Sequence, residues 1–78
     1  MRKITWVISR SNPTHFFGEI HLGNIPTFHF GFTTNLKGLL QMNETLVSDE
    51  EMTKVRHSIN AMYEIWKEVR NITFPPPS

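Results

Sequence analysis

The sequence predicts an α+β fold of two layers, in which a meander sheet of three to four antiparallel strands is covered on one face by a single long C-terminal helix. Two observations predict it. Apolar residues alternate with polar ones between residues 3 and 33, and they recur every three or four positions between residues 49 and 70. The chain has 78 residues and no cysteine. We therefore expect one domain over residues 1–74, stabilised by packing rather than by disulfides.

Three strands are predicted by the alternation in residues 3–9, 15–22 and 28–33, and the Asn, Gly and Pro residues between them are typical of turns. We expect Ser9 to pair with His15, and His21 with His29. In this register one face of the sheet collects nine apolar residues: Ile4, Trp6, Ile8, Phe16, Ile20, Leu22, Phe28, Phe30 and Phe32. A shift of one residue would scatter them over both faces, so the pattern specifies the faces well.

Residues 34–47 show no clean period because Gly38 and two asparagines interrupt it. Either a short fourth strand over residues 38–42 or an irregular packed loop fits, and we favour the strand. The segment contains six apolar residues for which we expect burial: Leu36, Leu39, Leu40, Met42, Leu46 and Val47.

The helix is the clearest element. Residues 48–51, Ser-Asp-Glu-Glu, form a capping box, which predicts a helix from about Asp49 to Arg70. Three consecutive prolines follow at residues 75–77. They predict a disordered Pro-rich tail over residues 75–78.

The apolar stripe of the helix is expected to cover the sheet. Its alternating spacing of three and four residues also fits a seam between two helices, and the helix is longer than a small sheet needs. We therefore expect a homodimer. Its candidate contacts lie near the far end of the helix: Met62, Tyr63, Trp66 and Val69.

The other face of the sheet has no second helix to cover it, so we expect it to be the surface that binds a partner. The candidate contacts on this face are Lys3, Val7, Arg10, His15, Phe17, Glu19, His21 and His29. In the expected register His21 and His29 are cross-strand neighbours with Glu19 diagonal to His29. Two imidazoles and a carboxylate are able to ligate zinc or iron. We favour a solvated or interfacial pair of histidines and expect no metal and no cofactor.

Composition restricts the other partners. The formal net charge is +1, and phosphate binding favours concentrated Lys and Arg, so nucleic acid is not the favoured partner. No stretch approaches the roughly 20 apolar residues that cross a membrane. With no segment that resembles a signal peptide and no cysteine, we expect a cytoplasmic protein without a membrane partner.

One segment and the order of elements resemble known proteins. Phe30, Gly31 and Phe32 match part of the aromatic strand motif of RNA-recognition and cold-shock domains, in which bases stack on exposed rings. In the expected register these rings face the helix, so we interpret them as core. The order of three strands and a helix is similar to that of parts of some small antitoxins and of compact phage-encoded inhibitors, a likeness of fold alone.

No catalytic motif is present: there is no cysteine nucleophile, no serine flanked by glycines and no glycine-rich phosphate loop. We expect a non-enzymatic protein that acts stoichiometrically on another protein, as an inhibitor, antitoxin or phage anti-defence factor. The alternatives are a small-ligand (nucleotide) or single-stranded nucleic-acid binding domain and, third, a metal-dependent enzyme that uses Glu19, His21 and His29.

Overall fold

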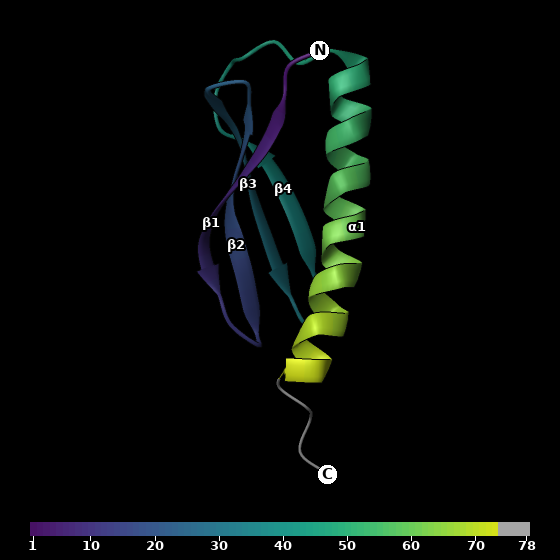
Figure 1. Cartoon of the computed structure of the whole chain (residues 1–78). Helices are drawn as coiled ribbons and strands as arrows, with labels where there is room; N and C mark the ends of the chain where they lie inside the picture. Colours follow the sequence, from purple (N-terminus) through teal and green to yellow (C-terminus); the bar gives the residue numbers. More distant parts are fainter. Residues whose placement is uncertain (74–78) are drawn as a thin grey trace.

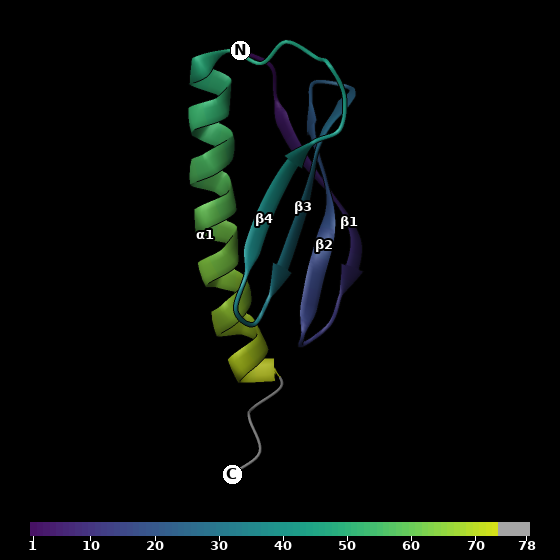
Figure 2. The same ribbon diagram turned by 180° about the vertical axis from the view of Figure 1, so that it is seen from behind.

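The computed structural model describes residues 1–73. Four strands precede one helix: β1 (Ile4–Ser11), β2 (His15–Leu22), β3 (Ile25–Thr33), β4 (Lys37–Gln41) and α1 (Asp49–Thr73). The strands form one antiparallel sheet in the order β1-β2-β3-β4, and α1 runs along one face of it (Figures 1 and 2). The predicted α+β fold is confirmed, with the fourth strand present. The predicted tail at residues 75–78 lies outside the described residues.

The register of both hairpins differs from the expected one by about two residues. Val7 lies opposite Glu19 in the first hairpin, and His29 lies opposite Glu19, not His21, in the second. The second turn is tighter than expected because Gly23, at a φ of 63°, allows a loop of two residues between β2 and β3. Since side chains alternate with a period of two, a shift of two leaves each residue on its expected face.

Each hairpin also contains an irregularity, one between Ile8 and Arg10 and one between Ile20 and His21. At the first, Ser9 is the extra residue, and β1 passes so close to Gly18 that a Cβ there would clash with the backbone oxygen of Val7. A bulge shifts the alternation by one residue. Arg10 consequently lies opposite Phe17, on the face of the sheet away from α1.

The core lies between the sheet and α1. Its buried members are Ile20, Leu22, Phe28, Phe30 and Phe32 from the sheet and Val55, Ile59 and Trp66 from the helix. Aromatic rings fill much of this space; the ring centroids of Trp6 and Phe30, for example, lie 4.7 Å apart. Of the nine apolar residues expected on this face, Ile8 is the exception, with 43% of its surface exposed. It sits in the edge strand beside the bulge.

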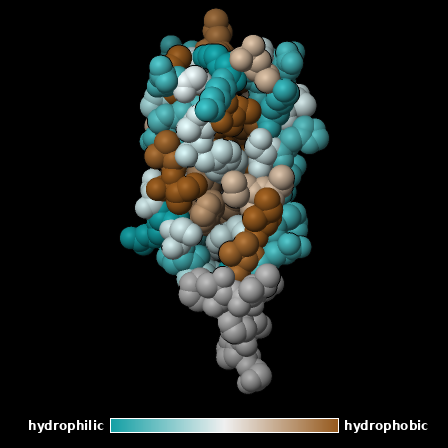
Figure 3. Space-filling model, viewed as in Figure 1, coloured by the Kyte–Doolittle hydropathy of each residue, from teal (hydrophilic) through white to brown (hydrophobic). Residues whose placement is uncertain are grey.

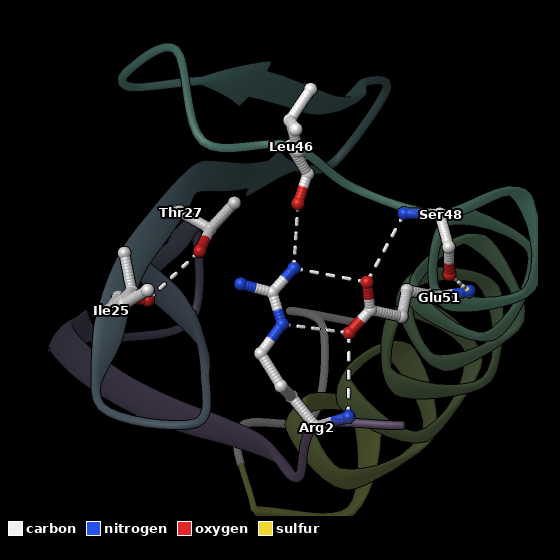
Figure 4. Close-up of polar contacts among 6 residues, drawn as sticks. All are labelled: Arg2, Ile25, Thr27, Leu46, Ser48 and Glu51. Atoms are coloured by element: carbon white, nitrogen blue, oxygen red, sulfur yellow. Dashed lines mark hydrogen bonds and ion pairs between the residues drawn. The ribbon is translucent and has the colours of Figure 1, made fainter.

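The capping box forms as predicted and also anchors the start of the chain (Figure 4). The Ser48 N–H donates to Glu51 at 3.1 Å and the Glu51 N–H donates to the Ser48 hydroxyl at 3.1 Å. Arg2 binds the same carboxylate: its Nε donates to one oxygen at 2.9 Å and a terminal nitrogen donates to the other at 3.0 Å. The Arg2 guanidinium, followed by the Ser48 N–H, lowers the pKa of Glu51 to about 2. The beginning of β1 is thereby tied to the first turn of α1.

Candidate functional site

The face of the sheet turned away from α1, called here the open face, is a continuous surface across all four strands. Its central row follows from the register: Val7, Glu19, His29 and Leu40 lie opposite one another, one from each strand. Val7 and Leu40 expose 42% and 69% of their surface, and His29 is also exposed. The row thus places apolar groups at the two outer strands and charged or polar groups between them.

A second group on the open face surrounds Phe17. The Arg10 guanidinium lies 5.9 Å from the centroid of the Phe17 ring, and the His15 ring packs edge-on against it with centroids 6.1 Å apart. Phe17 lies opposite Gly31, and Gly31 lies opposite Gly38. Because neither glycine has a side chain, the ring borders bare backbone across β3 and β4. An aromatic ring beside flat backbone is suited to contact with another molecule.

Glu19 and His21 interact directly. The His21 Nε2 lies 3.0 Å from the Glu19 Oε1, and both side chains are partly buried. The expected pairing of His21 with His29 is wrong, because His29 lies opposite Glu19. Within the part of the chain that the structure describes, no three His, Asp or Glu side chains gather closely enough to hold a metal ion.

The expected partner contacts within the strands lie on one surface. The alternation places Val7, His15, Phe17, Glu19, His21 and His29 on the open face, and the bulge at Ser9 brings Arg10 to it. Lys3 lies directly before β1 and is exposed. Sequence reasoning missed Leu40, for which burial was expected. The same expectation is wrong for Leu36 and Leu46, which expose 66% and 90% of their surface. The predicted strand itself contained the signal, because neighbouring residues in a strand point to opposite faces. Leu39 lies opposite the buried Phe30, so Leu40 lies on the open face.

The expected dimer contacts on α1 separate into two kinds. Trp66 is 6% exposed and belongs to the core, with its ring 6.0 Å from that of Phe32. Met62 and Tyr63 are partly buried against the same core. Val69 instead exposes half of its surface, as does Ile65 one helical turn before it. The apolar surface that α1 leaves free is therefore centred on Ile65 and Val69.

Hydrophobic surface appears on two elements of the side seen in Figure 3, over β1 and over the C-terminal half of α1. The exposed apolar residues of these elements are Val7, Ile8, Ile65 and Val69. By contrast, Phe28, Phe30 and Phe32 are buried, at 3% exposure or less; Phe30 and Phe32 are the rings that match the aromatic strand motif of RNA-recognition domains. These three rings have no face free for stacking on bases.

Among residues 1–73, no helix combines the length and the apolar character needed to cross a membrane. Comparison of the chain with protein-family models, with curated protein sequences and with solved structures finds no match. The functional assignment therefore depends on the geometry of the open face.

Proposed function

We propose that this chain is a small non-enzymatic binding protein that acts stoichiometrically on another protein, in the manner of an inhibitor, an antitoxin or a phage anti-defence factor. The observation that carries the proposal is the open face, where exposed apolar groups on the two outer strands lie beside charged and polar groups on the two inner ones. Protein interfaces combine apolar and aromatic contacts with hydrogen-bonding groups. The proposal includes a cytoplasmic location.

Phe17 is the anchor in this proposal. Its ring has few rotatable bonds to immobilise, and Arg10 and His15 already hold it on two sides. Preorganised aromatic and arginine side chains dominate the binding energy of many protein interfaces. Val7 and Leu40 extend the apolar contact towards the two outer strands, and Glu19, His21 and His29 supply charge and hydrogen bonds that select the partner.

The experiment is capture of the partner by the purified, tagged chain from lysate of the source cells, with Phe17→Ser combined with His29→Asp as the test variant. Lys54→Ser combined with Ala61→Asp is the matched control, because both residues are exposed on α1. We expect the parent and the control to retain one protein at equimolar ratio and the test variant to lose it, while all three melt at similar temperatures. Retention at full strength by the folded test variant would overturn the proposal.

We further propose a homodimer formed by the exposed apolar side that includes Ile8, Ile65 and Val69. Sedimentation equilibrium should give twice the chain mass for the parent. Ile65→Glu combined with Val69→Lys should give the monomer mass, since charges cannot be buried at this surface without a large desolvation cost. A parent that sediments as a monomer at every concentration would rule out the dimer and leave the open-face proposal intact.

One observation favours a second function. The Phe17 ring with the Arg10 guanidinium beside it is also an arrangement on which a nucleobase can stack, as in single-strand and nucleotide binding. This alternative predicts that the gently purified protein carries material absorbing at 260 nm. It also predicts that affinity for single-stranded nucleic acid falls steeply with salt. A protein-binding module should show neither property.

A further inference from the structure

We propose that the free edge of β4 and the neighbouring side of α1 form a second binding site. Its ligand is an extended peptide segment of a partner protein, in which two acidic side chains flank an apolar one. This site is separate from the open face and does not depend on the function proposed for it. Figure 2 shows the molecule from the side of β4, with α1 running beside the strand.

A groove lies between β4 and α1. Its volume is about 370 Å³, and the residues that line it are Lys37, Gly38, Leu39, Met52, Arg56, Ile59 and Asn60. Leu39, Met52 and Ile59 pack with the core and form an apolar floor. The groove is therefore able to receive an apolar side chain from outside.

The rim of the groove is positively charged. Lys37 and Arg56 both line it, and none of its lining residues is acidic. Lys37 is held in place, because its Nζ donates to the Asn60 side-chain oxygen at 2.6 Å and lies 5.5 Å from the centroid of the Tyr63 ring. Arg56 is exposed and forms no ion pair within residues 1–73. Acidic side chains are the complement of such a rim.

The outer edge of β4 offers free backbone groups for hydrogen bonding. Met42 donates to Thr27 and Thr33 donates to Leu36, each at 2.8 Å, so the even-numbered residues of this strand turn their backbone groups towards β3. In an antiparallel ladder the direction alternates. The N–H and C=O groups of Lys37, Leu39 and Gln41 consequently point away from the sheet. β4 is the last strand of the sheet, so these groups are free to pair with an added strand.

The free backbone groups and the groove coincide in space. The Leu39 side chain lies on the α1 side of the sheet, and its backbone groups are among those that point outward. A peptide residue paired with Leu39 would direct its side chain over the apolar floor. The residues two positions before and after it would direct theirs to the same side, where Lys37 and Arg56 stand. A small anion would satisfy the charges alone, whereas an extended acidic peptide satisfies the charges, the floor and the strand edge together.

The test uses a fluorescein-labelled heptapeptide of sequence Thr-Glu-Thr-Leu-Thr-Glu-Thr and the full-length protein, with binding followed by fluorescence anisotropy. We expect saturable binding that weakens about tenfold with Arg56→Glu and that does not change with Lys54→Glu, the same kind of charge reversal elsewhere on the exposed surface of α1. Replacing both glutamates of the peptide with lysine should abolish binding to the parent and restore part of it to Arg56→Glu.

Amide hydrogen exchange tests the geometry. Peptide addition should slow exchange at Lys37, Leu39 and Gln41 and leave the amides of Gly38 and Leu40, which already face β3, unchanged. Exchange that slows on β1, or no change at β4, would overturn the proposal, as would equal binding of a peptide with serine in place of its leucine, which would indicate an anion site only. The variant Phe17→Ser with His29→Asp should bind the peptide normally, so this result and that of the open-face experiment are independent.

Discussion

The two faces of the sheet are built by the same strands but have opposite characters. In β3, Phe28 is 2% exposed whereas its neighbour His29 is exposed, and the alternation continues to Phe32, which is fully buried. The face under α1 is almost wholly apolar, and the open face mixes apolar, charged and glycine residues. One alternating pattern therefore specifies both the core and the open face. Substituting a residue that faces α1 should change stability, whereas substituting its neighbour in the strand should act on the proposed binding surface.

The largest difference should follow from truncating a core ring. Phe32 is fully buried and contacts the rings of Phe16, Tyr63 and Trp66, so Phe32→Ala should cost about 3–5 kcal/mol of unfolding free energy. In a domain of this size that is enough to leave much of the protein unfolded. His29→Ala, three residues earlier on the open face, should change stability by less than about 0.5 kcal/mol. Urea denaturation measures both, and similar costs for the two would contradict the assignment of faces.

Part of this comparison was predictable and part was not. The residues of each face were predicted because a register error of two residues does not move a side chain to the other face. The register itself was not predicted, because it depends on the bulge at Ser9 in the first hairpin and on the two-residue turn at Gly23 in the second, and neither has a signal in the alternation. The exposed Leu36 and Leu46 were missed for a related reason, since an apolar residue in an irregular segment has no period to indicate its direction.

The candidate site shows the same division. The expected partner contacts that follow from alternation within the strands, including Phe17 and His29, lie on the open face. Arg10 lies on the open face because of the bulge at Ser9, and no sequence pattern predicted this bulge. Trp66 was assigned to a dimer seam because the helical stripe cannot distinguish a sheet from a second helix as its neighbour; the structure places Trp66 against Phe16 and Phe32.

A loss of stability of intermediate size should follow from a substitution at Gly18, where the backbones of β1 and β2 lie close together. A Cβ at Gly18 would collide with the backbone oxygen of Val7, whereas at Gly38 the nearest atom would be 3.9 Å away. Gly18→Ala should therefore cost about 1–3 kcal/mol, and Gly38→Ala should be neutral or slightly stabilising, because it restricts the unfolded chain. Thermal unfolding of the two variants provides the measurement. Equal stability of the two variants would contradict the close approach of the β1 backbone to Gly18.

The link between Arg2 and Glu51 predicts a dependence on pH. Because the pKa of Glu51 is lowered from 4.5 to about 2 in the folded chain, the folded form binds its proton less readily than the unfolded form. The stabilising contribution of the Arg2–Glu51 pair is present above about pH 4.5 and is lost as the pH falls towards 2. Glu51→Gln should flatten this part of the stability profile measured by urea denaturation at several pH values. Glu64→Gln, at an exposed ion pair with Lys67, is the matched control and should leave the profile close to that of the parent.

The smallest expected effects test which residues are neighbours on the open face. A double-mutant cycle with Glu19→Gln and His21→Asn should reveal a coupling of about 0.2–1 kcal/mol, because the two side chains are in contact and only partly shielded from solvent. A second cycle with His21→Asn and His29→Asn should reveal none, since His29 lies opposite Glu19. A measurable coupling between the two histidines would instead favour the register that pairs them directly. Their independence would support the register in which Glu19, and not His21, lies opposite His29, and with it the central row of the proposed binding surface.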